Sequence, residues 1–261
     1  MIRIERRHGR PLRIGHRGAP ALAPENTLRS FRAAVEAGVD LVELDVLALD
    51  GGELVIAHSH DLHEVSHGAA RGTLHGKTLG ELRETCPELP TLDEALAFFV
   101  EEAQEVGVHA DLKSPRAALV LGDALAHFGL EGRALVSSEH FRALRKLTRS
   151  RPGLATALSL PRDLGISEDG PLAPLVRGGL AGIRLVLPVL VAPLLRSART
   201  TALSLHHSVL TFAAVRRAHE RGAAVIAWTV DGVADLARVE AAGVDAVVTN
   251  DPRIFVSTLQ G

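Results

Sequence analysis

Short apolar runs alternate along the chain with longer amphipathic stretches. The short runs are rich in Val, Leu, Ile and Ala and end at polar residues or glycine, a pattern typical of buried strands. The longer stretches repeat apolar residues at helical spacing. The predicted strands are Leu12–Gly15, Leu41–Leu49, Leu54–His58, Val108–Leu112, Ala134–Ser138, Ala155–Leu160, Ala202–His206, Val225–Val230 and Ala246–Thr249. The predicted helices include Glu25–Gly38, Leu92–Val106, Pro115–Phe128, Phe212–Arg221 and Val233–Ala242.

Two segments interrupt this regular alternation. The turn sequence Asp50-Gly51-Gly52 separates the second and third strands, which predicts that these two strands pair as a hairpin. Residues 59–90 are rich in His, Gly and Thr and are predicted to form an irregular insertion after the second barrel strand. The segment Gly182–Leu187 also resembles a strand. It would be one parallel strand too many for a closed barrel of eight, so we assign it to a helical crossover.

The alternation of strands and helices predicts a parallel sheet covered by helices. The chain has 261 residues, close to the roughly 250 that are typical of a single (β/α)₈ barrel. Hydrophobic residues make up 46% of the chain, which is enough for a large core. The prediction is therefore an α/β protein, a (β/α)₈ TIM barrel forming one domain over residues 1–261, with residues 59–90 as a short insertion.

Charge and cysteine content exclude several classes of protein. The formal net charge of -2 gives no strong basic field for nucleic acid or an anionic membrane. Cys86 is the only cysteine, which excludes a disulfide framework. The N-terminus is charged and has no apolar run of signal-peptide length. The apolar segment Leu185–Leu195 contains Pro188 and Pro193 and is too short and interrupted to span a bilayer. We expect a cytoplasmic protein without a nucleic-acid partner or stable membrane association.

Candidate chemistry lies at the carboxyl ends of the predicted strands, where α/β barrels place their active sites. Glu43 and Asp45 are two residues apart on one strand, so their side chains share a face about 7 Å apart. Two carboxylates inside a barrel repel each other unless a cation lies between them. Oxygen ligands favour Mg²⁺ or Ca²⁺. The alternative is a solvent-exposed strand edge, which the surrounding apolar residues of this strand argue against.

Asp111 and Lys113 have the same spacing at the end of a later strand. Asp111 is placed to complete the metal site, and Lys113 offers a positive charge to a phosphate oxygen. The alternative is an ordinary ion pair at a strand end. After the first strand, His16 has a suitable pKa for proton transfer near neutral pH, and Arg17 offers a planar fork to phosphate. Gly18 permits close approach of the backbone to a ligand.

His58 ends the returning strand of the predicted hairpin and is the histidine of this region that we expect to function. His60 is a second choice, and the other histidines of the insertion are expected at the surface. Trp228 is the only tryptophan and lies at a strand end, where it would line the pocket. The alternative for Trp228 is a core residue that closes the barrel.

Taken in order, these motifs resemble the glycerophosphodiester phosphodiesterase family. The segment IGHRGAPALAPENTLRSFRAAVEAGVDLVELDVLALDGGELVIAHSHDL is similar to its N-terminal signature: HRG, PENT, an E-x-D strand, and a D-G turn before a strand-terminal His. HADLKS resembles the family's acidic-x-Lys strand, and VIAWTVD and GVDAVVTNDP resemble its closing strands. The resemblance covers roughly residues 12–254.

The resemblance implies a role for each candidate residue. His16 and His58 resemble the family's general base and general acid, with His58 as the acid. The resemblance also implies a set of divalent-metal ligands, expected to hold Mg²⁺ or Ca²⁺, and a set of phosphate contacts. The implied metal ligands are Glu43, Asp45 and Asp111, and the implied phosphate contacts are Arg17 and Lys113. Family chemistry implies that a glycerol hydroxyl attacks phosphorus to give a cyclic phosphate, which water then opens to glycerol 3-phosphate.

The chain departs from the family pattern at several positions. The family usually has Glu where Asp111 stands, and often has Asp at Ser59 and Arg at Glu64. A Phe that is common after the Ser-Ser pair is replaced by Glu139. These changes affect the expected substrate pocket more than the expected chemistry. In the PENT match, Asn26 or Thr27 is expected to cap the first helix.

Three other functions fit parts of the sequence. His58-Ser59-His60 matches the H-x-H metal pair of amidohydrolase-type barrels, which would also need His206 and Asp251. A non-catalytic barrel that binds phosphodiesters is disfavoured, because every expected catalytic and metal position carries a competent residue. A lysophospholipase D-type activity would use the same site on larger substrates. The alcohol, the metal and the oligomeric state stay open.

Overall fold

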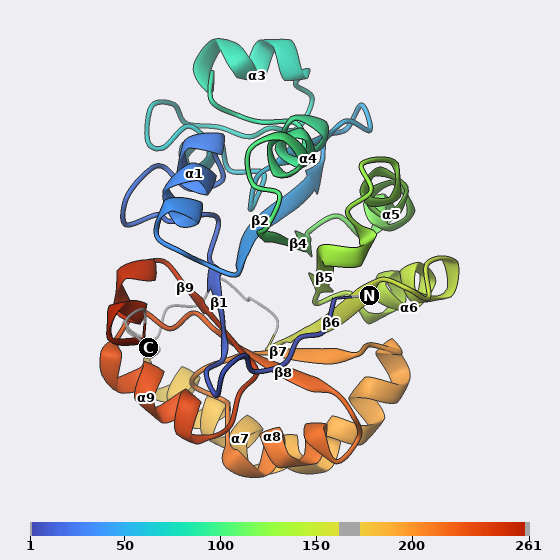
Figure 1. The fold of residues 1–261 in the computed structure, drawn as a ribbon. Helices are drawn as coiled ribbons and strands as arrows, with labels where there is room; N and C mark the ends of the chain where they lie inside the picture. The colour runs from blue at the N-terminus through green and yellow to red at the C-terminus, as the bar shows by residue number, and fades with distance from the viewer. Residues whose placement is uncertain (1, 162–172, 259–261) are drawn as a thin grey trace.

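The computed structural model describes residues 2–161 and 173–258. Within these residues eight parallel strands form a barrel, closed because β1 pairs with both β2 and β9. Figure 1 shows the helices around the outside of the strands. The strands are β1 Leu12–Gly15, β2 Leu41–Ala48, β3 Leu54–Ile56, β4 Gly107–Leu112, β5 Ala134–Ser138, β6 Ala155–Leu160, β7 Ala202–His206, β8 Ala224–Trp228 and β9 Ala246–Thr249. The predicted TIM barrel is confirmed.

The hairpin between β2 and β3 is also confirmed, since β3 runs antiparallel to β2 outside the closed barrel. The insertion that follows is more regular than predicted. It contains two short helices, α2 (Leu62–Val65) and α3 (Leu79–Thr85), and Thr78 and Glu81 form a reciprocal capping box at the start of α3. Figure 1 shows α3 as the helix furthest from the strands.

The remaining helices pack around the barrel, and each of the five helices whose bounds were predicted begins within three residues of the predicted start. They are α1 Leu28–Glu36, α4 Leu92–Glu101, α5 Ala118–His127, α6 Phe141–Ser150, α7 Ala173–Ala198, α8 Phe212–His219 and α9 Val233–Ala241. Helix α1 starts three residues later than predicted because the Thr27 side chain caps it and Asn26 has a positive φ of 56°. A left-handed residue cannot continue an α-helix. Thr91 caps α4, as expected.

The inside of the barrel is divided into an apolar layer and a polar layer. Leu12, Leu41 and Ile226 belong to the buried apolar cluster near the amino ends of the strands. Because side chains alternate along a strand, residues two positions further on face the same interior at a higher level. Those positions hold Glu43 on β2 and Trp228 on β8. The sequence pattern therefore places the polar layer at the carboxyl rim.

Helix α7 differs from the sequence prediction. Gly182–Leu187 lies within it, so the helical assignment is confirmed, but Pro188 and Pro193 do not interrupt it. Each proline removes one intrahelical hydrogen bond without ending the helix, which packs against α8. Residues Gly178–Ala198 have a mean hydropathy of 1.9 and are long and apolar enough to cross a membrane by length and composition alone. The expectation of a segment too short and interrupted to span a bilayer is therefore wrong.

Candidate active site

A cavity of about 1020 Å³ opens at the carboxyl rim of the barrel. The side chains around it come from the strand ends and the loops that follow them. Every predicted site residue except Asp45 lines this cavity: His16, Arg17, Glu43, His58, Asp111, Lys113 and Trp228. Asp45 is buried directly beside it. The predicted convergence of these strand ends at one rim is confirmed.

Three carboxylates meet at the base of the cavity. Glu43, Asp45 and Asp111 each offer an oxygen, and these oxygens lie within 4.8 Å of one another. Parallel pairing of β2 and β4 places Asp45 directly opposite Asp111. Burial, together with the charges of Asp45 and Asp111, raises the pKa of Glu43 well above its usual value. A divalent cation fits this all-oxygen group because it would offset the repulsion that raises that pKa.

Lys113 lies between two of these carboxylates. Its Nζ is 3.0 Å from Asp45 Oδ1 and 2.6 Å from Asp111 Oδ2. Burial opposes the charged ammonium, but the nearby carboxylates outweigh it and raise the pKa of Lys113. Burial likewise pushes the pKa of Asp45 upward, yet the charges of Lys113 and Arg17 hold that pKa below its usual value. Lys113 is therefore a permanent positive charge in the cavity.

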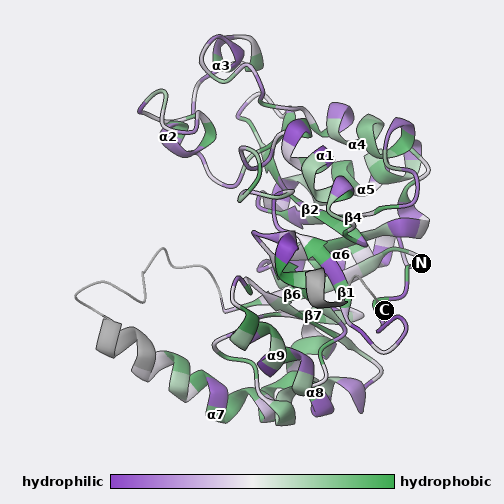
Figure 2. Ribbon diagram, turned by 60° about the vertical axis from the view of Figure 1, so that its left-hand side comes forward, coloured by the Kyte–Doolittle hydropathy of each residue, from purple (hydrophilic) through white to green (hydrophobic). Residues whose placement is uncertain are grey.

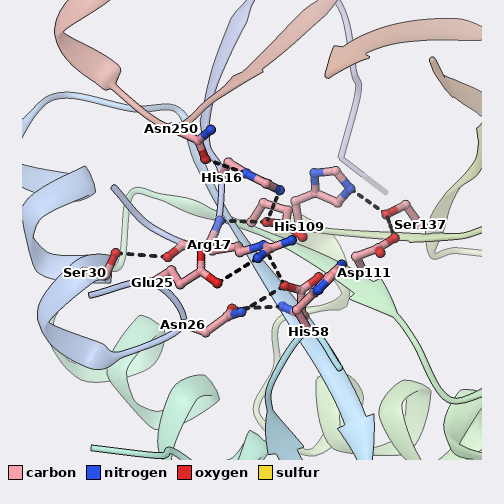
Figure 3. Close-up of polar contacts among 12 residues, drawn as sticks. His16, Arg17, Glu25, Asn26, Ser30, His58, His109, Asp111, Ser137 and Asn250 are labelled. Carbon is pink, nitrogen blue, oxygen red and sulfur yellow. Dashed lines mark hydrogen bonds and ion pairs between the residues drawn. The ribbon is translucent and has the colours of Figure 1, made fainter. Parts of the chain in front are cut away.

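Arg17 is held among carboxylates. Its Nε is 3.1 Å from Asp45 Oδ2, and its Nη1 is 2.7 Å from Glu25 Oε1 and 3.3 Å from Glu64 Oε1. Its backbone N–H donates to Glu43 Oε2 at 2.7 Å, from a residue with a positive φ of 50°. Figure 3 shows this side chain in the centre of the network. In addition to any phosphate contact, Arg17 thus positions the acidic group.

Asn26 is a site residue that the sequence interpretation missed. It does not cap α1, which Thr27 does. Instead, Asn26 Nδ2 donates to Asp45 Oδ2 at 2.9 Å, and the Asp45 N–H donates to Asn26 Oδ1 at 3.2 Å. The amide of Asn26 thus holds Asp45 through both its carboxylate and its backbone N–H. The PENT segment therefore serves the site as well as the helix.

His16 follows β1 and points one ring nitrogen toward the cavity. Its Nδ1 is 2.7 Å from Asn250 Oδ1, and Asn250 Nδ2 in turn donates to Asp231 at 2.7 Å. An amide oxygen can only accept, so Nδ1 carries the proton and Nε2 keeps its lone pair. That Nε2 is 4.0 Å from Glu43 Oε2. Burial and the charge of Arg17 lower the pKa of His16, so the neutral ring is favoured near neutral pH.

His58 follows β3 and is oriented by a carboxylate. Its Nδ1 is 2.7 Å from Glu64 Oε1, and Ser59 Oγ donates to Glu64 Oε2 at 2.5 Å. The hydrogen bond from His58 lowers the pKa of Glu64 to about 2, so this carboxylate is ionised at neutral pH. A carboxylate on one ring nitrogen fixes the orientation and the tautomer of the ring. The two unusual residues of this region, Ser59 and Glu64, therefore act together.

We predict that Glu64→Ala lowers kcat by about 10–100-fold, the usual cost of removing the partner that orients a functional histidine. Glu64→Gln should lose less, because its amide oxygen still accepts from His58 Nδ1. Steady-state kinetics on a glycerophosphodiester would measure both variants. Glu88→Ala, which removes an exposed glutamate of the same insertion, is the matched control. Wild-type kcat in Glu64→Ala would refute the orienting role.

His109 is a second residue that the sequence interpretation missed. It is buried on β4, and its Nε2 is 2.8 Å from Ser137 Oγ, which donates to Asp111 Oδ1 at 2.5 Å. Burial lowers the pKa of His109 to about 4, so the ring is neutral and donates from Nε2 to the serine. This series of hydrogen bonds, from His109 through Ser137, orients Asp111. The signal was present in the sequence, since His109 lies two residues before Asp111 and shares its face.

Trp228 lines the cavity at the end of β8, as predicted. Its ring meets that of His206 edge to face, with 5.1 Å between centroids. The indole Nε1 is buried and has no hydrogen-bond partner among the described residues. A buried donor without a partner is costly, which favours a ligand or water as its acceptor.

We predict that binding of glycerol 3-phosphate changes the fluorescence of Trp228. The chain contains one tryptophan, so the signal reports this position alone. Titration of the emission spectrum would measure the change, and Trp228→Phe should raise KM more than it lowers kcat. An emission spectrum that stays constant while calorimetry records binding would place Trp228 outside the ligand contacts.

The histidine-based metal pair is not supported by the structure. His60 stacks on His75, with ring centroids 3.9 Å apart, and His58 Nδ1 is engaged by Glu64. Across residues 2–161 and 173–258, the potential metal ligands that converge are the three carboxylates. The fold and this rim site define an α/β-barrel enzyme with an acidic centre beside fixed cations and two oriented histidines.

Comparison with known proteins agrees with this class. Residues 16–254 match the Glycerophosphoryl diester phosphodiesterase family, and the chain belongs to that family. It is 26% identical to the glycerophosphodiester phosphodiesterase of Caldanaerobacter subterraneus subsp. tengcongensis, over 95% of this chain and 97% of that protein. The chain is therefore an enzyme, a glycerophosphodiester phosphodiesterase.

Solved structures share the fold. A phosphodiesterase from Oleispira antarctica, in complex with sn-glycerol-3-phosphate, matches with a TM-score of 0.71 and 22% identity, over 96% of this chain and 97% of that one. The glycerophosphodiester phosphodiesterase from Thermotoga maritima matches with a TM-score of 0.70 and 22% identity, over 97% of this chain and 100% of that one.

Proposed function

We propose that this enzyme hydrolyses small glycerophosphodiesters to an alcohol and glycerol 3-phosphate, using a divalent cation and two histidines. The observation that carries the proposal is the carboxylate group of Glu43, Asp45 and Asp111 in the same cavity as His16 and His58. Figure 3 shows the two histidines on either side of Arg17. The product bound in the Oleispira antarctica structure is consistent with this choice of substrate.

The three carboxylates would hold Mg²⁺ or Ca²⁺, which would supply positive charge to the phosphoryl oxygens. Lys113 adds a fixed charge beside them and stays protonated, since its carboxylate neighbours raise its pKa. Together these charges offset the negative charge that the phosphoryl group carries in the transition state. Arg17, Asn26 and Ser137 keep the carboxylates in place through the hydrogen bonds and ion pairs described above.

The two histidines transfer the protons of the reaction. His16 Nε2, with its lone pair, takes the proton from the attacking hydroxyl of glycerol as the new P–O bond forms. His58 Nε2 gives a proton to the departing alkoxide as the P–O bond to the alcohol breaks. Water then opens the cyclic phosphate, with the histidine roles reversed, to give glycerol 3-phosphate. Nδ1 of each histidine is engaged, by Asn250 and Glu64 respectively, so proton transfer would use Nε2.

Release of glycerol 3-phosphate from a panel of glycerophosphodiesters, with and without chelator, tests the proposal. The panel should include a lysophospholipid, because the cavity of about 1020 Å³ lies at the upper end of the usual range for ligand pockets. We expect release that stops on chelation and returns with Mg²⁺ or Ca²⁺. Release of a different phosphate product, or turnover that chelator leaves unchanged, would contradict the proposal.

A further inference from the structure

Helix α7 has one face packed on the barrel and one face exposed that is strongly apolar. Leu187 and Val191 are buried on the inner side. On the outer side Leu185 is 81% and Val189 78% exposed, more than any other large apolar side chain among the described residues. Val186 adds to the same outer face. Exposed apolar groups that cluster on one face of a helix indicate an interaction surface.

The charge of this region indicates which partner fits the apolar face. The sequence of α7 contains three arginines and neither aspartate nor glutamate. Arg196 lies three turns after Leu185 and therefore on the same face. The adjacent α8 also has two exposed arginines, Arg216 and Arg217, which share one carboxylate, Glu220, and so leave a net positive charge beside α7. Two copies of this cationic helix would repel each other, whereas anionic lipid headgroups would attract it.

The attachment of α7 to the barrel favours a helix that lies on a membrane over one that spans it. Leu187, Val191 and Leu195 are buried against the rest of the protein, so lipid cannot surround this part of the helix and can meet its outer face. An apolar face with flanking arginines suits the headgroup boundary. Figure 2 shows the described part of α7 extending on the side of the barrel where α2 and α3 lie.

We propose that the outer face of α7 docks this enzyme onto the surface of anionic phospholipid bilayers. Leu185, Val186, Val189 and Leu190 enter the boundary between headgroups and acyl chains, while arginines contact lipid phosphates. The cavity at the carboxyl rim would then open close to the lipid surface. This docking goes beyond the proposed hydrolysis and does not depend on it.

Sedimentation of the full chain with vesicles tests the docking without any substrate. Vesicles of phosphatidylglycerol and phosphatidylcholine should retain the protein, and vesicles of phosphatidylcholine alone should retain less. Raising the salt concentration should weaken the retention, since it screens the arginines. Wild-type protein that stays in solution with anionic vesicles at low salt would overturn the proposal.

Paired variants locate the contact. The double variant Leu185→Ser with Val189→Ser should reduce the vesicle partition coefficient by at least about tenfold, because two apolar side chains no longer enter the boundary. Val120→Ser, on the exposed side of α5, is the matched control and should bind like the wild type. Equal loss in the control would overturn the assignment to α7. Circular dichroism confirms that both variants fold.

Two other results would identify a partner other than the bilayer surface for the outer face of α7. The outer face of α7 joins two copies of the chain if the wild type is a dimer in sedimentation equilibrium and does not bind vesicles, while the double variant is a monomer. If vesicle-bound wild type resists extraction at alkaline pH, the helix inserts more deeply than a docking face would. Either result overturns docking at the bilayer surface. Release by alkaline extraction, together with a monomer in solution, supports it.

Discussion

His16→Ala and His58→Ala should each lower kcat by on the order of 10²–10⁴, the usual range for loss of general acid–base catalysis. In-line displacement at phosphorus separates the attacking oxygen from the leaving oxygen, so one histidine cannot serve both. Both side chains are at the rim and partly exposed, so the fold should survive. Steady-state kinetics on glycerophosphodiesters would measure the loss, with His219→Ala on the outer surface as the control.

Leaving-group chemistry distinguishes the two histidines. A nitrophenyl ester departs without protonation, so it should partly restore turnover in the variant that lacks the general acid. We expect rescue of His58→Ala and little rescue of His16→Ala. Rescue of the opposite variant would exchange the two roles. Near-wild-type turnover of both variants on glycerophosphodiesters would show the mechanism to be wrong.

Chelation should abolish turnover, and replacement of any one of the three carboxylates by its amide should do nearly the same. Glu43→Gln is the most informative case. Burial and like charge raise the pKa of Glu43, so its negative charge is costly in the metal-free protein, and glutamine removes that charge. We therefore expect Glu43→Gln to be at least as stable as wild type in chelator but to lose the stabilisation that a bound cation gives.

Thermal unfolding with and without Mg²⁺ or Ca²⁺ measures this effect independently of activity. Wild-type Tm should rise with cation concentration, and the Tm of Glu43→Gln should stay nearly constant. Asp111→Glu, which restores the residue usual in the family, should retain both turnover and the rise in Tm. A wild-type Tm that does not respond to either cation, combined with full activity in chelator, would remove the metal from the mechanism.

Much of the fold could be predicted from sequence because burial in a parallel barrel leaves a strong local pattern. Strands such as Ala134–Ser138 and Ala202–His206 have the predicted bounds, since apolar runs between polar ends specify them directly. The same reasoning placed Glu43, Asp111 and Trp228 at one rim. Once the strands are parallel and in register, strand ends must meet.

The contacts that support the site could not be predicted in the same way. Asn26 or Thr27 was expected to cap the first helix, and Thr27 does so, but the contact of Asn26 with Asp45, which is distant in sequence, was not foreseen. Glu64 was noted as a departure from the family, but the sequence does not show that its carboxylate meets His58. Such pairs depend on loop conformation, which has no periodic signal.

The length of the apolar helix α7 was mispredicted for a different reason. Proline usually ends a helix, so Pro188 and Pro193 made the apolar segment look short. Contacts with α8 outweigh the two missing hydrogen bonds, and tertiary packing of this kind has no local signature. The helical assignment of Gly182–Leu187 succeeded because it was argued from the number of strands a closed barrel can hold.

Because of the hairpin of β2 and β3, the proposed catalytic groups stand on two different parts of the fold. His16 and the three carboxylates stand on strands of the closed barrel, whereas His58 stands beyond β3, at the start of the 59–90 insertion, together with its partner Glu64. In the proposed mechanism the proton donor therefore belongs to the insertion side of the site, whereas the carboxylates belong to the barrel. An insertion of different length should therefore change which leaving alcohols the enzyme accepts more than it changes the carboxylates at the strand ends, and the ion pair between Arg17 and Glu64 is the contact that such an exchange has to preserve.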